Sequence, residues 1–258
     1  MKNKTKKYFA KIAFAALLLS ASLPAAGYAA IEHVIDPTIY QNKFGYYYVP
    51  MNHKRPALNA IKAGKVWEEE TLAYIQEAYV KGTSIIHAGA YFGDMLPFYS
   101  KLVGSNSVWA FEQAEINFIC AKATRLINNL KNVKLFQLAV SNKNIQVAIL
   151  TKRNGVPLGG SSTLYEGKKN NLEEIELIDS VKLDDLIPRE ERIGIIHLDI
   201  EGHELKALQG AQRIINENHP LLVLEVWSNK SEEIHQHVTS LGFQHVDTLN
   251  GNRVYRFH

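Results

Sequence analysis

The 258-residue sequence contains one cysteine, Cys120. A single cysteine cannot form an intramolecular disulfide, and it cannot supply a cluster of thiolate metal ligands. Its neighbours in the sequence are apolar or small, which favours a buried structural thiol. The composition therefore excludes a scaffold held by internal disulfides and a cysteine-based zinc centre, and no other residues are assigned as metal ligands.

The chain also lacks a hydrophobic run long enough to span a bilayer, which takes roughly 20 residues. The apolar run from Ile12 to Leu23 is shorter, follows a lysine-rich start, and ends at Pro24 before the small residues of Gly27–Ala29. This is the layout of a secretory signal peptide over residues 1–29. We therefore expect export, to a periplasm or the medium, with no stable membrane span after cleavage. An uncleaved leader would instead leave the protein cytosolic or tethered to a membrane.

Basic residues are not in excess outside this leader. The leader holds five lysines and no acidic residue, so its removal takes the formal charge from +3 to −2. Nothing in the remaining sequence predicts the basic surface that a nucleic-acid partner requires.

The dinucleotide-binding fingerprint G-x-G-x-x-G is also missing. A predicted strand at Ser84–Ala88 leads into a turn that has glycine only at Gly89 and Gly93, followed by a predicted helix. Such a turn exposes backbone N–H groups at the start of a helix. The absent third glycine argues against a dehydrogenase and favours a nucleoside ligand without a pyrophosphate.

The most informative stretch runs from Ile195 to Ala211 and reads IIHLDIEGHELKALQGA. Aliphatic residues predict a buried strand, and apolar spacing predicts one helix from His203 through Ile215. Asp199 and Glu201 fall where the strand should end, at the edge where open α/β sheets bind ligands. The alternative is that both carboxylates only cap the following helix.

Other segments repeat the strand–helix order. A strand at Ser107–Phe111 ends at Glu112, about 20 residues after the glycine turn, where nucleotide folds place an acid that binds ribose. We expect a third strand at Val133–Leu138 and an alternating strand at 145–149. The polar stretch from Thr151 to Leu177 is predicted to be a long loop, either on the substrate side or as a surface excursion.

Near the end of the chain, Asn250-Gly251 separates two alternating segments, which is a strong signal for a β-hairpin. The element order predicts an α/β fold with a doubly wound, mostly parallel sheet and a C-terminal antiparallel hairpin. We divide the chain into the leader (1–29), an N-terminal cap or lid segment (30–80) and a main domain (81–258).

From about Tyr46 to its end, the chain resembles the FkbM-type methyltransferases, which use S-adenosylmethionine. The resemblance rests on four segments, which are IIHAGAYFGDM (85–95), VWAFEQAEINF (108–118), VKLDDLIP (181–188) and HLDIEGHELKALQGA (197–211). It implies the seven-stranded class I methyltransferase fold, which is Rossmann-like, with the hairpin supplying the last two strands.

The resemblance also implies a cofactor site. Gly89, Ala90 and Gly93 would line the methionine end of S-adenosylmethionine. Glu112 would bind the ribose, and Gln137, Leu138 and Ala139 would lie near the adenine. The remaining candidates for cofactor contacts are His87, Tyr91, Asp94, Gln113 and Asp199.

This chain departs from the family pattern at three positions. His87 stands where the family usually has an acid, His197 where it usually has a lysine, and Tyr91 where related enzymes have a small residue. A neutral histidine beside a sulfonium is electrostatically acceptable, and an unperturbed histidine pKa permits that state at neutral pH.

The family points to O-methylation of a hydroxyl on a sugar or another small secondary metabolite, so the expected partner is a small-molecule or glycan acceptor. A hydroxyl acceptor needs a base to remove its proton. Glu201 is the first candidate and His203 the second, with Asp199 on the cofactor side or holding the loop. The alternative is a noncatalytic exported binding module on the same scaffold. His87, His197 and the cytosolic origin of S-adenosylmethionine favour that alternative.

Overall fold

The computed structural model describes residues 36, 38–51, 55–164, 174–227 and 230–258. The predicted leader at residues 1–29 lies outside these ranges, as does the segment 165–173 of the predicted loop. None of the described helices is long and apolar enough to cross a bilayer.

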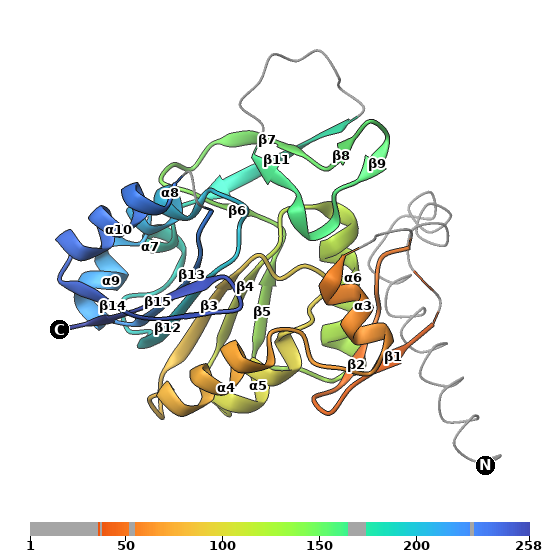
Figure 1. Ribbon diagram of the computed structural model, residues 1–258, viewed down its shortest axis with the longest axis horizontal. Helices are drawn as coiled ribbons and strands as arrows, with labels where there is room; N and C mark the ends of the chain where they lie inside the picture. Colours follow the sequence, from red (N-terminus) through yellow and green to blue (C-terminus); the bar gives the residue numbers. More distant parts are fainter. Residues whose placement is uncertain (1–35, 37, 52–54, 165–173, 228–229) are drawn as a thin grey trace.

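A seven-stranded sheet forms the centre of the protein (Figure 1). Its order is β14-β15-β13-β12-β3-β4-β5, in which the five strands from β13 to β5 are parallel and β15 is antiparallel to both its neighbours. The strands are β3 (Ser84–Ala88), β4 (Val108–Phe111), β5 (Val133–Phe136), β12 (Ile193–Leu198), β13 (Leu221–Glu225), β14 (Phe243–Leu249) and β15 (Asn252–Phe257). The predicted α/β fold is confirmed, with a sheet that is mixed rather than wholly parallel.

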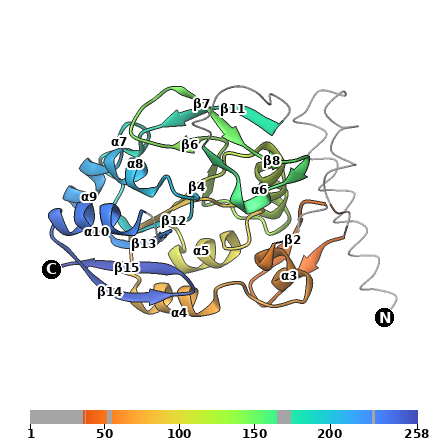
Figure 2. The same ribbon diagram turned by 45° about the horizontal axis from the view of Figure 1, so that its top comes forward.

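Helices cover both faces of this sheet (Figure 2). On one face, Ile85 and Ile195 pack with side chains of α4 (Glu69–Ala78), α5 (Leu96–Val103) and α6 (Glu115–Ile127). On the other face, Ile86 and Ile196 pack with α7 (Leu183–Leu186), α8 (Glu204–Gln209), α9 (Gln212–Asn218) and α10 (Ser231–Ser240). Strands buried on both faces explain the near-continuous aliphatic runs in the sequence.

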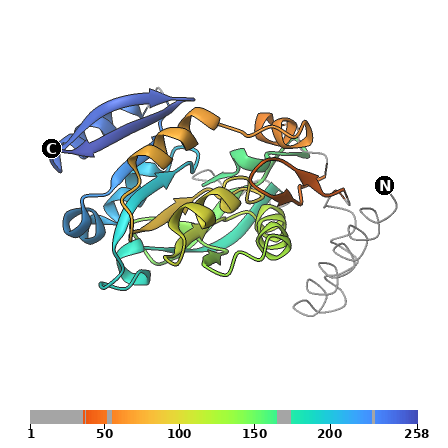
Figure 3. The same ribbon diagram turned by 90° about the horizontal axis from the view of Figure 1, so that it is seen from below.

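The C-terminal hairpin forms at the predicted residues. Asn250 and Gly251 have φ values of 51° and 93°, and a two-residue turn with φ positive at both positions matches the right-handed twist of the strands. The hairpin lies beside α4 (Figure 3), where the Thr71 hydroxyl donates a hydrogen bond of 3.0 Å to Asn250 Oδ1.

The prediction of one helix from His203 through Ile215 is wrong. The chain forms two helices, α8 and α9, which are separated at Gly210-Ala211. Gly210 lies against the backbone of Ser141, since a Cβ at this glycine would be 2.0 Å from the Ser141 carbonyl oxygen. Leu208 and Ile215 still pack in one core cluster, which explains why their spacing resembled that of a single helix.

Two further boundaries differ from those predicted. The third strand ends at Phe136 rather than Leu138, and Ala139–Val140 forms β6 of a second sheet with the order β10-β7-β11-β6. In that sheet β7 (Gln146–Leu150) is the strand expected from alternation at 145–149, displaced by one residue.

The described part of Thr151–Leu177 is not a structureless loop. It contains the paired strands β8 (Lys152–Arg153) and β9 (Val156–Pro157), a 3₁₀ turn at Gly159–Ser161, β10 (Thr163–Leu164) and the start of β11 (Ile175–Val181). Both β10 and β11 pair antiparallel with β7. Pairing with β7 stabilises β10 and β11, so their local composition did not reveal them. By contrast, β8 and β9 pair with each other across Asn154-Gly155, a local hairpin signal that the sequence prediction did not use.

The N-terminal segment packs on α6. It contains β1 (Tyr40–Gln41), β2 (Tyr46–Tyr47) and α3 (Pro56–Lys62), and buries Tyr47 and Leu58 in a cluster with Phe92 and Cys120. The Tyr48 N–H donates to Thr124 Oγ1 at 3.1 Å. The thiol of Cys120 is buried as expected, and the assignment of residues 30–80 as a separate cap stays a prediction.

Candidate functional site

The carboxyl ends of β3, β4, β12 and β13 meet around a cavity of about 180 Å³. Seven of the predicted site residues line it, and they are His87, Gly89, Tyr91, Asp94, Glu112, Asp199 and Glu201. This is the edge at which open α/β sheets bind ligands, because the strand ends and the following turns leave a crevice there.

A second cavity, of about 20 Å³, adjoins the first. Both are lined by Gly89, Glu112, Gly160 and Asp199. The smaller cavity has both polar and apolar walls and includes two further predicted residues, Gln113 and Leu138. Ala90, Gly93 and Ala139 are buried close to the glycine turn or in β6, and they line neither cavity.

The glycine turn after β3 needs glycine for two reasons. Gly89 has a φ of +91°, and a Cβ at this position would be 1.8 Å from the carbonyl oxygen of Asp199. The turn therefore lies directly against the start of the acidic turn that follows β12. Tyr91 also has a positive φ, of 46°, although it is not a glycine.

We expect Gly89→Ala to destabilise the fold by at least about 3 kcal/mol, because the new Cβ forces a backbone shift at the strand ends. Gly82→Ala is the matched control, since Gly82 has a φ of +87° but no atom within 4 Å of the position that a Cβ would occupy. It should cost only the roughly 1–2 kcal/mol of the left-handed conformation. Chemical denaturation measures both, and equal losses would contradict the close approach.

Glu112 is buried at the end of β4. Its Oε2 accepts a hydrogen bond from the Tyr91 N–H at 2.7 Å, and its Oε1 accepts one from the Ala114 N–H at 2.8 Å. Burial raises the pKa of Glu112 to about 7, although these backbone donors oppose the increase. Oε1 also accepts a hydrogen bond from Asn117 Nδ2 at 3.4 Å, so Oε2, which has a second lone pair, is the oxygen that can still accept a hydrogen bond from a ligand.

His87 and His197 lie side by side on β3 and β12 but differ in their surroundings. The rings stack with centroids 4.9 Å apart. Nδ1 of His197 lies 2.7 Å from the Tyr99 hydroxyl, and His197 does not line the cavity. His87 does line it, and neither of its ring nitrogens forms a hydrogen bond of normal geometry with a described residue.

Both histidines are neutral at neutral pH. Burial lowers the pKa of His87 well below its usual range, the neighbouring His197 lowers it further, and the His197 backbone opposes this decrease. Burial lowers the pKa of His197 to about 4. The departure from the family pattern at His87 therefore adds no positive charge to the cavity, and the one at His197 lies away from it.

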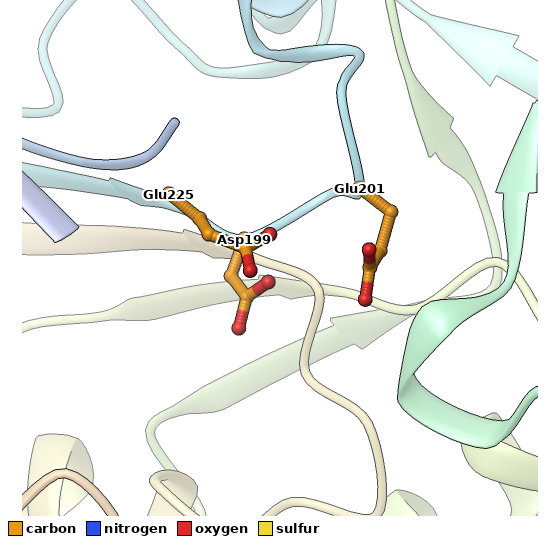
Figure 4. Close-up of side chains that lie close together, drawn as sticks. All are labelled: Asp199, Glu201 and Glu225. Atoms are coloured by element: carbon orange, nitrogen blue, oxygen red, sulfur yellow. The ribbon is translucent and has the colours of Figure 1, made fainter. Parts of the chain in front are cut away.

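Three carboxylates gather at the ends of β12 and β13. Asp199, Glu201 and Glu225 each place one oxygen within 4.8 Å of the others (Figure 4). Glu201 reaches this position through a φ of 57°, and left-handed backbone at a residue other than glycine is costly and concentrates at functional sites.

These acids perturb one another. Burial raises the pKa of Glu201 to about 7, and the charge of Glu225 adds to the increase. Burial and Glu225 together raise the pKa of Asp199 well above its usual range. A carboxyl group with a pKa near 7 can accept and release a proton at neutral pH, which is what a general base requires.

The alternative that Asp199 and Glu201 only cap the helix does not describe this turn. The N-cap of α8 is His203, and no side chain caps it. A different residue, Glu204, holds the turn, because its Oε1 accepts hydrogen bonds of 3.1 Å from the N–H groups of Ile200 and Gly202. His203 points elsewhere, with Nε2 3.0 Å from Ser141 Oγ, and it lines a separate cavity.

The segment around the 3₁₀ turn covers the site. Side-chain amides of Gln113 and Asn117 donate to the carbonyl oxygens of Ser162 and Gly159, at 2.6 and 3.0 Å. Thr163 Oγ1 donates to the Glu201 carbonyl oxygen at 2.9 Å. Of the two interpretations of this stretch, its described part fits the substrate-side one, since it lies against the cavity.

Several residues of the site were not predicted. Glu225 ends β13 as Asp199 follows β12, so its place at a strand end was an available signal. Arg55, Trp67 and Glu68 reach the cavity from the N-terminal segment, and no motif marked them. Glu204 belongs to the acidic motif, but its burial beneath the turn depends on the three-dimensional path of the chain.

Comparisons with known proteins agree on the family. The Methyltransferase FkbM domain matches residues 87–256. No curated protein matches the chain. The family match confirms the FkbM methyltransferase family predicted from the resemblance, a family whose cofactor is S-adenosylmethionine.

One solved structure shows the same fold at low sequence identity. The FkbM methyltransferase from Methylobacillus flagellatus KT has a TM-score of 0.50 and 19% identity, over 72% of this chain and 50% of that one. This chain thus spans about half the length of that protein. A SAM-dependent methyltransferase from Aquifex aeolicus has a TM-score of 0.44 and 14% identity, over 78% and 93% of the two chains. A Streptococcus mutans protein in complex with SAH has a TM-score of 0.45 and 15% identity, over 79% and 97%. The domain match covers more than half of the sequence, and the chain belongs to the FkbM methyltransferase family.

Proposed function

We propose that the protein is an S-adenosylmethionine-dependent O-methyltransferase that acts on a hydroxyl of a sugar or another small secondary metabolite. The observation that carries the proposal is the acid-lined cavity at the strand ends. There Glu201 lies within 4.8 Å of Asp199, and Asp199 contacts the glycine turn. A candidate base is thus close to the expected position of the methyl donor.

The residues of the two cavities fit the cofactor. Phe111, Leu138 and Ile200 line the smaller cavity and offer apolar contacts to an adenine ring, although this cavity of about 20 Å³ would have to widen to admit the ring. Glu112 stands at its junction with the larger cavity, where it would bind the ribose. The methionine end would lie along the glycine turn. Its sulfonium and ammonium groups are positively charged, and six carboxylates line the larger cavity. The cofactor supplies an electrophilic methyl group, and the residues of this chain place the acceptor in line with it.

Glu201 is the proposed general base. Its carboxylate faces the larger cavity, whereas the ring of His203 lies outside that cavity against Ser141. This placement supports the choice of Glu201 over His203. Asp199 lies between Glu201 and the glycine turn, which supports its assignment to the cofactor side of the site.

The charge of the cavity restricts the class of acceptor that can bind. Six carboxylates and one arginine, Arg55, line it, so an anionic acceptor would be repelled and a neutral polyol would not. The N-terminal segment contributes Arg55, Trp67 and Glu68 to the lining, which supports its proposed role as a cap. Export through the leader remains a prediction alongside this function.

The test is methyl transfer by the full-length protein to a panel of neutral sugars and alcohols, each paired with its phosphorylated or uronic acid form. We expect neutral acceptors to gain one methyl group on oxygen, detected by mass spectrometry and located by NMR. Anionic forms should react at least about tenfold more slowly. Transfer only to amines, or faster transfer to the anionic forms, would contradict the proposal. Cofactor binding without transfer to any acceptor would favour the noncatalytic binding module.

A further inference from the structure

The hydrogen bonds of the fold account only in part for the acidic cluster of Asp199, Glu201 and Glu225, in which Glu201 hydrogen-bonds to the Ser161 side chain and Asp199 to Glu225. No described lysine, arginine or histidine lies within ion-pair distance of any of the three carboxylates. Glu225 Oε2 is buried, and no described residue other than the carboxyl group of Asp199 is available to hydrogen-bond to it. Carboxylates held this close repel one another, and the nearest cation that lines the cavity, Arg55, donates its Nε–H to the Leu158 carbonyl oxygen at 2.7 Å.

An independent observation points to a ligand in the same place. His87 lines the same cavity from β3 and is only 2% exposed, yet both its ring nitrogens lack a hydrogen-bond partner of normal geometry among the described residues. Buried polar groups are nearly always satisfied by protein, water or ligand, and an exception needs an explanation. A hydrated ion beside the acids would supply one, because a water molecule on the ion can hydrogen-bond to the imidazole.

We propose that Asp199, Glu201 and Glu225 bind one hard divalent cation, of the class of Mg²⁺, Mn²⁺ and Ca²⁺. Carboxylate oxygens are the donors that these ions prefer, and the set contains no thiolate. Oxygens on opposite sides of one ion lie about 4.2 Å apart for Mg²⁺ and about 4.6–5.2 Å apart for Ca²⁺. Three oxygens that all lie within 4.8 Å of one another have a common point no more than about 2.8 Å from each, so they can reach a single Ca²⁺ after small movements and a single Mg²⁺ after movements of less than about 1 Å.

The site is built on rigid elements. Asp199 and Glu225 stand at the ends of adjacent parallel strands, and the Asp199 N–H donates to the Ala88 carbonyl oxygen at 3.0 Å. Glu201 is held in a turn whose backbone is fixed by Glu204. Ligands that are positioned before the ion arrives lose little conformational freedom when it binds.

The role of the ion rests on the proposed function, whereas its binding does not. An ion at this place would let the acceptor hydroxyl coordinate it, which lowers the pKa of a bound hydroxyl. Each carboxylate needs to offer only one oxygen to the ion, so Glu201 keeps a second oxygen for the acceptor proton.

The experiment titrates the full-length protein with Mn²⁺ alone, in the absence of cofactor and acceptor, and follows free Mn²⁺ by electron paramagnetic resonance. We expect one saturable site per chain, from which Mg²⁺ and Ca²⁺ displace the probe.

Asp199→Asn and Glu225→Gln should each weaken Mn²⁺ binding at least about tenfold, because loss of residues that merely support a metal site already costs that much. The matched control is Glu68→Gln, which removes a carboxylate from the same cavity but keeps an acceptor for Asn252 Nδ2. It should change binding by less than about threefold.

Thermal unfolding of the same proteins gives a second readout. Mn²⁺ should raise the Tm of the parent and of Glu68→Gln, because a ligand that binds only the folded state stabilises it, and should leave the Tm of Asp199→Asn unchanged. Failure of the parent to bind one Mn²⁺ at millimolar concentration would overturn the proposal. An equal loss of Mn²⁺ affinity in Glu68→Gln and Glu225→Gln would also overturn the proposal. It would mean that the overall negative charge of the cavity attracts Mn²⁺ and that the three proposed ligands do not bind it. Stoichiometric displacement of Mn²⁺ by S-adenosylmethionine would show that the cluster instead binds the cofactor's ammonium group, and would leave the proposed methyl transfer intact.

Discussion

Glu201→Gln is expected to lower turnover by about 10²–10⁴-fold, the loss that accompanies removal of a general base. The substitution keeps the size of the side chain and its place in the left-handed turn, but an amide cannot take the acceptor proton. S-adenosylmethionine affinity should stay within about threefold of the parent, because the ribose and adenine contacts lie on the β4 side of the site. Steady-state kinetics and a binding titration on the same preparation measure the two effects separately.

The control for this prediction is His203→Asn. His203 lies outside the larger cavity, so its loss should lower turnover by less than about tenfold. If His203→Asn proved the more damaging change, or if Glu201→Gln kept turnover within about threefold of the parent, Glu201 would not be the base. His203 would then be the remaining candidate.

Glu112→Gln is expected to weaken S-adenosylmethionine binding by about 10-fold to 150-fold, since a hydrogen bond to a charged acceptor contributes roughly 1.5–3 kcal/mol. It should also destabilise the fold. Both carboxylate oxygens accept backbone N–H groups, of Tyr91 and Ala114, and an amide nitrogen can satisfy neither. We expect a loss of about 1–3 kcal/mol in the free energy of unfolding, because one buried donor is left without its partner.

Glu115→Gln is a suitable control, since Glu115 is exposed three residues along the chain at the start of α6. It should leave both affinity and stability unchanged. Calorimetric titration gives the affinities and urea denaturation the stabilities. Unchanged affinity in Glu112→Gln would mean that the nucleoside binds elsewhere.

The sequence was most informative where local pattern and tertiary position agree. Prediction was correct for the strand at Ser84–Ala88 and for the end of β12 before Asp199. Buried parallel strands appear in the sequence as runs of aliphatic residues, and turns follow at their carboxyl ends. The Asn250-Gly251 hairpin is likewise set by two adjacent residues with positive φ.

Prediction failed where distant residues decide the structure. The helix break at Gly210 depends on contact with Ser141, and β11 depends on pairing with β7. Burial of Glu204 beneath the acidic turn and the approach of Glu68 and Arg55 to the cavity also need the folded chain. In the candidate site, sequence reasoning therefore identified most residues at the strand ends, with the exception of Glu225, and missed those contributed by other layers.

A calorimetric titration of the full-length protein with S-adenosylmethionine tests most directly whether the strand ends bind the methyl donor. We expect saturable binding of one cofactor per chain despite histidine at position 87, because that ring is neutral and the cavity around it is acidic. Absence of saturable binding at millimolar cofactor, in a protein shown to be folded, would contradict the claim that these strand ends form a methyl-donor site.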